Sequence, residues 1–459
     1  MPQSEPTNPI PSGMQIAGHL RDVVRCRTVS FDENSPAEPF LELHALLQTL
    51  YPRLHQALRR ETVNRLSLLY TWPGSQPDLP GVAFLAHQDV VPVVDGEAGW
   101  TQPAFSGAIT DGYIYGRGVI DMKSQLVALM EAVETLLQTG FQPCRTIYLA
   151  FGHDEEVGGR QGARAIAGLL MERGVRLDAL LDEGGAVTGE VAPGYAGLLA
   201  TIAMAEKSFA NVRLEARARA GHASVPGRHT AIGRLSRAVL RLERRPMPAR
   251  LDFVRPTIQA LLPRLPWPAR LLFGNLWLTG GLVKTGLAQS PISNAMIRNT
   301  IAPTVVQGGY KINILPEKAT VDFNCRLLPG ENVDGLLAHF RQVVGDEQVT
   351  ISLIDTSAPS KKPGDLDTQT YASLAEAIRR CYGDVPVCPM VMTGSTDARH
   401  YEAICDHVFR FQPNRFDRPE DDHTHGIDER LPVDQLPEMV SFNAQLMRAW
   451  AGPVKREGV

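Results

Sequence analysis

Three adjacent acidic residues follow a short apolar run in the first half of the chain. Asp154, Glu155 and Glu156 come two residues after the run RTIYLAF, and the residues Val-Gly-Gly follow them. Adjacent carboxylates repel one another and are costly to remove from water together. Their position at the exit of a predicted buried strand therefore calls for a compensating cation, and the triplet indicates a metal site.

Candidate ligands also stand at the ends of two other predicted strands. His87 ends the run GVAFLAH, and Asp182 ends the run LDALLD. In an open α/β sheet the ligand crevice lies beyond the carboxyl ends of the strands. Strand geometry alone therefore predicts that His87, Asp182 and the acidic triplet converge on one edge of a sheet.

Further residues of the same chemical types lie in loops. Asp89 follows His87 by two residues, where a carboxylate can hold the second ring nitrogen of a ligating histidine. Asp121 precedes a predicted helix, where an N-cap is the alternative, and His425 in HTHGIDER carries little information by itself. Carboxylates and imidazoles without thiolates suit zinc, or manganese or cobalt in its place, at a catalytic site with open positions.

The elements that would position these residues alternate between helix and strand up to about residue 200. Apolar spacing of three and four in PFLELHALLQTLYPRL and MKSQLVALMEAVETLL predicts amphipathic helices between short apolar strands. This alternation favours an α/β sheet with helices on both faces. Beyond it, the alternating run KSFANVRLEARARA and a basic helix over Thr230–Arg245 predict a smaller α+β domain. We predict a catalytic domain of residues 1–200 and 356–459, with residues 201–355 inserted in it.

Composition excludes several other classes of protein. The formal net charge of −4 gives no electrostatic reason to expect a nucleic-acid partner. The six cysteines form no C-x-x-C pair, so neither a disulfide framework nor a thiolate zinc site is expected. The polar, proline-rich start of the chain lacks the pattern of a signal peptide, and the longest apolar window is too short to span a bilayer. We therefore expect a cytoplasmic protein with no membrane partner.

Taken together, the blocks from FLAHQDVV to HTHGIDER resemble the M20 family of dinuclear zinc peptidases and amidohydrolases. The resemblance implies a mixed-sheet zinc-peptidase catalytic domain with an inserted ferredoxin-like lid or dimerisation domain. It also implies two zinc ions, bridged by Asp121, and a cis peptide bond after this residue. The implied ligands of one ion are His87, Asp121 and Asp182, and those of the other are Asp121, Glu156 and His425. Glu155 would be the general base for a metal-bound water, with Asp89 beside the site.

The same resemblance assigns residues beyond the metal site. His222 matches a histidine that reaches the active site of the other subunit, which implies a homodimer. Asn313 and Arg326 match positions that bind the free carboxylate of the substrate, a task suited to a guanidinium. Gly394 and Ser395 lie in a segment that resembles the substrate-lining loop. For these residues an ordinary solvated loop or strand position is the alternative.

A proline- and aromatic-rich insertion over residues 246–291 resembles the lid of the carboxypeptidase S branch. It could form an apolar acyl or side-chain pocket, a dimer contact or an extra core layer. We predict hydrolysis of an amide bond next to a free carboxylate, in a short peptide or an N-acyl amino acid. The alternatives are a catalytically silent relative that binds metal or peptide, and a structural dimerisation protein with calcium loops. The two histidines argue against calcium, which prefers an all-oxygen shell.

Overall fold

The computed structural model describes residues 10–31, 35–93, 98–189 and 195–453. The chain divides into two compact units. Unit 1 comprises the described residues up to Met204, the segment Gly364–Pro389 and the described residues from Thr396, whereas unit 2 comprises Ala205–Pro363 and Met390–Ser395. The segment Met390–Ser395 falls in the part of the chain that we assigned to the catalytic domain.

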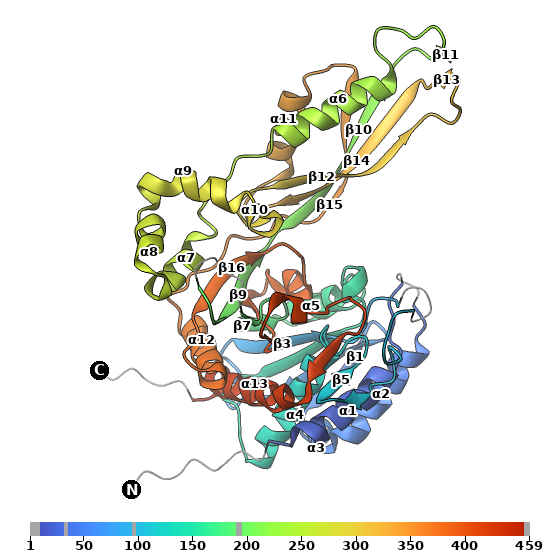
Figure 1. Ribbon diagram of the computed structural model, residues 1–459. Coiled ribbons are helices and arrows are strands. Elements are labelled where there is room, and N and C mark those ends of the chain that lie inside the picture. The colour runs from blue at the N-terminus through green and yellow to red at the C-terminus, as the bar shows by residue number, and fades with distance from the viewer. Residues whose placement is uncertain (1–9, 32–34, 94–97, 190–194, 454–459) are drawn as a thin grey trace. The chain divides into compact units, whose positions relative to one another are not determined.

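A large mixed sheet runs through unit 1 (Figure 1). The strands β6, β3, β7 and β17 are parallel neighbours, whereas β1 and β2 continue the sheet in antiparallel fashion. Every residue of β3 is buried, as expected for a central strand covered on both faces. In spatial order the sheet contains β1 (Arg59–Val63), β2 (Ser67–Trp72), β6 (Ile147–Gly152), β3 (Gly81–His87), β7 (Leu177–Asp182), β17 (Cys405–Arg410), β9 (Leu198–Glu206), β8 (Val187–Gly189) and β18 (Arg415–Phe416), with β16 (Val387–Met392) paired to β9.

Helices cover both faces of this sheet, which confirms the predicted mixed α/β class. One apolar core joins one face of the sheet to α1, α4, α12 and α13, and a second core joins the other face to α5 and η4. The predicted helix PFLELHALLQTLYPRL is two helices, because Pro52 opens a new one at its first position. The helices are α1 (Gly13–Arg25), α2 (Glu38–Leu50), α3 (Pro52–Ala57), α4 (Lys123–Gln138), α5 (Ala163–Glu172), α12 (Gln369–Tyr382) and α13 (Leu436–Ala451), with short turns η2 (Glu155–Val157), η4 (Asp397–Tyr401), η5 (Pro419–Asp421) and η6 (Val433–Gln435) and a small sheet of β4 (Ile109–Thr110), β5 (Tyr113–Tyr115) and β19 (Arg430–Pro432).

Unit 2 is built on an antiparallel sheet of order β12-β14-β10-β15. Along the chain its elements run β10, α6, β12, β14, α11, β15, which is the ferredoxin-like order. The helices α6 and α11 share one apolar core with the sheet, and Thr230, the first residue of the predicted helix, is the N-cap of α6. The elements are β10 (Ser208–Arg217), β11 (Gly221–His222), α6 (Ala231–Arg244), β12 (Thr300–Gly308), β13 (Ile314–Leu315), β14 (Lys318–Leu327), α11 (Val333–Val344) and β15 (Val349–Thr356).

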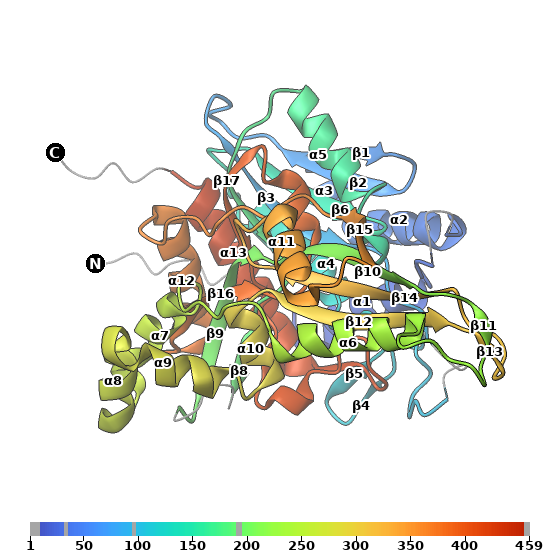
Figure 2. The same ribbon diagram turned by 90° about the horizontal axis from the view of Figure 1, so that it is seen from above.

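The insertion between α6 and β12 is helical. Its inner side chains form a small core of their own, around Leu251, Val254, Val283 and Ile297. Within unit 2 these helices lie at the opposite end from β11 and β13 in both views (Figures 1 and 2). The helices are α7 (Arg255–Leu261), η3 (Leu262–Arg264), α8 (Trp267–Gly274), α9 (Leu276–Leu287) and α10 (Pro291–Ile297). Across all the described ranges, no helix is both long enough and apolar enough to cross a bilayer.

Candidate metal centre

The strand ends meet as strand geometry predicts. His87 is the last residue of β3 and pairs in register with Gly152, the last residue of the parallel strand β6. The acidic triplet follows β6, and the strand β7 on the other side of β3 ends at Asp182. Because parallel strands present their carboxyl ends on one edge, three chain segments deliver polar side chains to one place.

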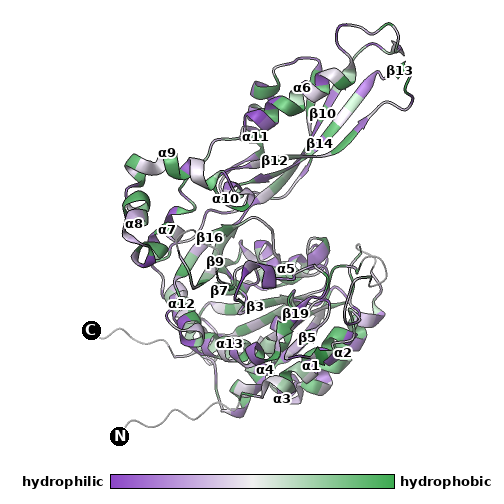
Figure 3. Cartoon of the chain, viewed as in Figure 1, coloured by the Kyte–Doolittle hydropathy of each residue, from purple (hydrophilic) through white to green (hydrophobic). Residues whose placement is uncertain are grey.

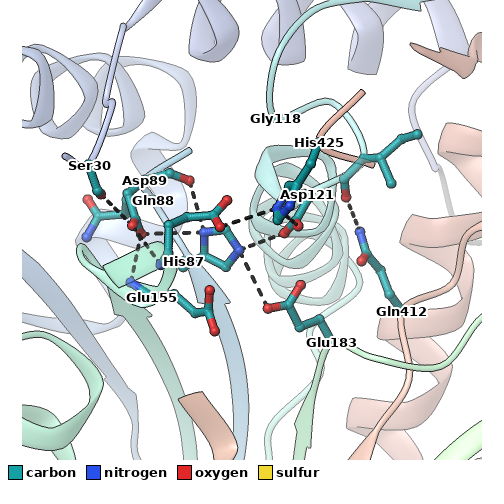
Figure 4. A network of polar contacts seen from close by, with 12 residues as sticks. Ser30, His87, Gln88, Asp89, Gly118, Asp121, Glu155, Glu183, Gln412 and His425 are labelled. Carbon is teal, nitrogen blue, oxygen red and sulfur yellow. Dashed lines mark hydrogen bonds and ion pairs between the residues drawn. The ribbon is translucent and has the colours of Figure 1, made fainter. Parts of the chain in front are cut away.

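His87 and His425 approach the same carboxylate from two sides (Figure 4). The Nε2 atom of His87 lies 2.8 Å from Oδ1 of Asp121, and Nε2 of His425 lies 3.0 Å from Oδ2 of the same residue. Nε2 of His425 also lies 3.3 Å from Oε2 of Glu156. The peptide bond after Asp121 is cis, as the family resemblance implies. Asp121 therefore occupies the bridging position between the two histidines.

Two acidic residues stand at the end of β7: the predicted ligand Asp182, which is its last residue, and Glu183, which follows it. Oε1 of Glu183 lies 3.6 Å from Nε2 of His87 (Figure 4). The Oδ2 atom of Asp182 instead accepts a hydrogen bond of 2.7 Å from the backbone N–H of Ala398. Within the described residues, two groups of atoms are close enough to hold an ion: His87 with Asp121 and Glu156, and His87 with Glu155 and Glu183.

Asp89 supports both sides of the cluster. It is fully buried, and its carboxylate accepts hydrogen bonds from the backbone N–H groups of Glu155 (3.2 Å) and Glu156 (3.1 Å) and from Ser30 Oγ (2.5 Å). The Nδ1 atom of His87 lies 2.9 Å from the backbone oxygen of Asp89. These contacts orient the imidazole so that Nε2 faces Asp121.

The members of the acidic triplet have separate environments. The carboxylate of Asp154 turns away from the cluster and accepts hydrogen bonds from the backbone N–H groups of Gln161 (2.7 Å) and Gly162 (2.8 Å). Glu155 and Glu156 are left facing the cluster, and each belongs to a different group of possible ligands. The triplet therefore contributes one carboxylate that holds a backbone turn, Asp154, and two that face the possible metal positions, Glu155 and Glu156.

The pKa shifts and hydrogen bonding of the clustered side chains favour a bound cation. Burial and the neighbouring Glu183 raise the pKa of Glu155 well above its usual value, and burial and Asp121 do the same for the pKa of Glu183. Hydrogen bonds to Asp121 and Glu156 raise the pKa of His425 to about 10. Among the described residues, Oε1 of Glu156 is buried without a hydrogen-bond partner. An orphaned carboxylate oxygen among imidazoles and further carboxylates fits a divalent metal ion such as zinc.

A buried carboxylate that the sequence analysis missed holds the Asp121 loop. Glu429 is fully buried and accepts hydrogen bonds from Arg117 Nη1 (2.7 Å) and from the backbone N–H groups of Gly118, Ile120 and Asp121. Its nearest partners are more than 300 positions away in the chain, and only its place within HTHGIDER, four residues after His425, could have suggested a role. Glu429 therefore positions Asp121 through the backbone.

We expect Glu429→Gln to destabilise unit 1 by about 3 kcal/mol, because the amide leaves Arg117 buried without a counter-charge and places N–H donors against N–H donors. The free energy of unfolding from guanidinium titration measures this effect. Glu420→Gln is the matched control, since Glu420 is exposed and its ion pair among the described residues is a 3.7 Å contact with Arg418. Equal stability of the two variants would contradict a positioning role for Glu429.

The other predicted site residues belong to unit 2. His222 is exposed in β11 with Nδ1 2.7 Å from Ser224 Oγ, and Asn313 is exposed beside β13. Arg326 lies on β14 with its guanidinium over the ring of Phe209. Gly394 and Ser395 are half-buried. The part that these five residues play in the site stays a prediction.

A mixed sheet with a carboxylate and imidazole cluster at its strand ends is typical of metal-dependent hydrolases. The family model described as Peptidase family M20/M25/M40 matches residues 83–449. The chain therefore belongs to this family of hydrolytic enzymes, which confirms the resemblance.

Relatives and solved structures agree with this assignment. The chain is 34% identical to the "Probable carboxypeptidase S-like 2" of Dictyostelium discoideum, over 95% of this chain and 85% of that protein. It is 33% identical to the N-fatty-acyl-amino acid synthase/hydrolase of Homo sapiens, over 94% of this chain and 86% of that protein. Its fold is similar to that of an M20 family metallo-carboxypeptidase from Sulfolobus solfataricus, with a TM-score of 0.66 at 16% identity, covering 95% of this chain and 99% of that one. A dinuclear metal binding M20 peptidase from Bacillus subtilis has a TM-score of 0.58 at 15% identity, covering 95% and 97% of the two chains.

Proposed function

We propose that this enzyme is a dinuclear metal-dependent hydrolase that cleaves an amide bond next to a free carboxylate. The observation that carries the proposal is the cluster of His87, Asp121, Glu156 and His425, in which His87 is buried and His425 half exposed, with Glu155 and Glu183 beside it. We assign two zinc ions, with cobalt or manganese as substitutes, to this cluster. Asp121 would bridge them, His87 and Glu183 would hold one, and Glu156 and His425 the other. Glu183 replaces Asp182 in this assignment because the Asp182 carboxylate faces the Ala398 amide.

Bound divalent ions would lower the pKa of an attacking water and polarise the amide carbonyl. The chain's own contribution is proton transfer by Glu155. Its backbone N–H is held by the Asp89 carboxylate, and burial together with the neighbouring Glu183 raises the pKa of its own carboxyl group well above the usual value. Glu155 would accept the proton of the attacking water and return it to the leaving amine.

Of the two substrate classes, we favour N-acyl amino acids with apolar acyl groups. The N-fatty-acyl-amino acid synthase/hydrolases match nearly the whole chain at 33–35% identity, and two carboxypeptidase S-like proteins match it at 34% and 31%. A homodimer is part of the proposal. The edge strand β12 of unit 2 exposes Val305 and Val306, and the segment before β13 exposes Tyr310 and Ile312, so this side of unit 2 offers apolar surface to a second copy. The cytoplasmic location stays a prediction.

A hydrolysis screen tests the function. Dipeptides and a series of N-acyl amino acids of increasing acyl length would be offered to the enzyme loaded with zinc, cobalt or manganese, with Glu155→Ala as the blank. We expect the highest kcat/KM for the apolar N-acyl amino acids. A kcat/KM that is higher for dipeptides would reverse the substrate preference. Absence of turnover of both classes by the metal-loaded enzyme would favour the silent relative.

Recognition of the substrate carboxylate gives a separate prediction. Arg326→Lys is expected to raise KM by about 10-fold or more with little change in kcat, because a single ammonium replaces a fork of guanidinium donors. Steady-state kinetics on the best substrate and on its carboxamide analogue would measure the effect, which should disappear for the carboxamide. Arg213→Lys is the control, since Arg213 lies in the same sheet but is exposed and paired with Asp322. Identical KM values for Arg326→Lys and the parent enzyme would contradict a role of Arg326 in binding the substrate carboxylate.

A further inference from the structure

The outer surface of the insertion is apolar although the helices are short and exposed. Trp277 is 85% exposed and Leu282 is 72% exposed, both on α9. The helix α9 is apolar all round, since Lys284 is its only charged residue and Val283 already supplies its buried contact. A helix with this composition is normally covered on every side. The exposed large apolar side chains of α8, α9 and α10 are Trp267, Leu271, Trp277, Leu278, Leu282 and Ile292, and we call them the apolar patch.

The apolar patch is not needed to fold the insertion. The small core around Leu251, Val254, Val283 and Ile297 already buries the inner faces of these helices. In Figure 3 the helices α8 and α9 both contain residues in the hydrophobic colour. Two tryptophans and several leucines left in water on one short segment are typical of a surface that binds another apolar phase.

The charge of the insertion selects the kind of partner. Between Asp252 and Glu317 the chain contains no acidic residue, while the whole chain has a net charge of −4. The same stretch contains basic residues throughout: Arg255, Arg264, Arg270, Lys284, Arg298 and Lys311. The segment exposes apolar side chains, and all of its charged residues are basic. Such a segment is complementary to a surface with anionic groups outside and an apolar interior.

A pocket beside the apolar patch places basic groups where an anionic headgroup could bind. Its volume is about 360 Å³, and Trp277, Arg255, Lys284 and Arg250 line it together with Gly280 and Gly281. Arg250 is paired with Asp252, which also lines the pocket, and with Glu331. Within the part of the chain that the structure describes, neither Arg255 nor Lys284 has an ion-pair partner. Two free cations therefore stand next to an exposed indole ring.

We propose that α8, α9 and α10 form a docking surface for an anionic lipid bilayer. The apolar patch would enter the boundary between headgroups and acyl chains, and Arg255 and Lys284 would bind lipid phosphates at its rim. This inference is independent of the proposed hydrolytic function and replaces the expectation that the protein has no membrane partner.

Vesicle flotation tests the proposal with the full chain. We expect the protein to float with mixed phosphatidylglycerol–phosphatidylcholine vesicles at low salt and to remain behind with pure phosphatidylcholine. The variant W277A/L278Q/L282Q should bind at least about 50-fold more weakly, because three apolar side chains are lost. The variant R255Q/K284Q should bind about 25-fold more weakly, at about fivefold for each basic residue. Added salt should weaken binding of the parent protein.

Matched controls separate the patch from general effects. Leu41→Gln removes an exposed leucine of α2 in unit 1, and R379Q/R380Q removes two exposed cations of α12, and both should float like the parent protein. Thermal melting checks that each variant is folded. The proposal is overturned by equal flotation with the two vesicle types, by unchanged binding of W277A/L278Q/L282Q, or by a parent protein that does not float. Loss of a dimer in sedimentation of that variant, without vesicle binding by the parent, would show that the patch joins two copies of the chain.

Discussion

Replacing Glu155 with glutamine is expected to lower kcat by about 10²–10⁴-fold while the metal content stays unchanged. Glutamine keeps the size of the side chain and the backbone hydrogen bond from residue 155 to Asp89, so the shape of the site is retained. It cannot accept a proton from the attacking water. Steady-state kinetics on the best substrate, together with metal analysis by mass spectrometry, measures the two quantities separately.

The control for this prediction is Glu172→Gln at the exposed end of α5, which should have the kcat of the parent enzyme. If Glu155→Gln were fully active, Glu155 could not be the general base. If it lost its metal, Glu155 would be a ligand, as the proximity of its carboxylate to His87 and Glu183 also allows. The kinetic and the analytical results therefore distinguish the two roles.

The second large effect is expected from Glu183→Gln. This substitution should remove one metal equivalent and lower kcat/KM by about 100-fold or more, because a neutral amide replaces a carboxylate beside His87. Asp182→Asn should keep both metal equivalents, since an asparagine oxygen can still accept the hydrogen bond from the Ala398 N–H. Metal content after dialysis and activity after addition of zinc, cobalt or manganese are the measurements.

The comparison of these neighbours decides between the two ligand assignments. Loss of metal from Asp182→Asn with full retention in Glu183→Gln would restore the ligand set that the sequence resemblance implies. Activity of both variants that survives chelation and does not respond to added metal would contradict a metal centre altogether. Each variant changes a single group, so the result does not depend on the rest of the ligand set.

The difference between Asp182 and Glu183 has a simple physical origin. Successive side chains in a strand point to opposite faces, so a shift of one residue at the end of β7 changes which side chain faces the cluster. Asp182 still has strand geometry and turns its carboxylate to the Ala398 amide, while Glu183 lies just past the strand end and faces His87. Apolar patterning locates the end of a strand but not the direction of the residue that follows it.

The positions of several strands and helices were predictable because they depend on residues that are close together in the sequence. The apolar runs located β3, β6 and β7, and the basic helix predicted over Thr230–Arg245 matches α6 to within one residue at each end. The helix break at Pro52 was missed because the apolar spacing of α2 continues into α3.

The sequence by itself determined the family, the mixed α/β class and the chemical types of the site, because motif order and strand ends are local properties of the chain. Only the tertiary structure decided which neighbours each carboxylate contacts. It turned Asp154 to the amides that precede α5, brought Glu183 to His87, and brought Glu429 to the Asp121 loop from more than 300 residues away. These choices depend on how buried charges find partners across the fold, and no local pattern specifies that.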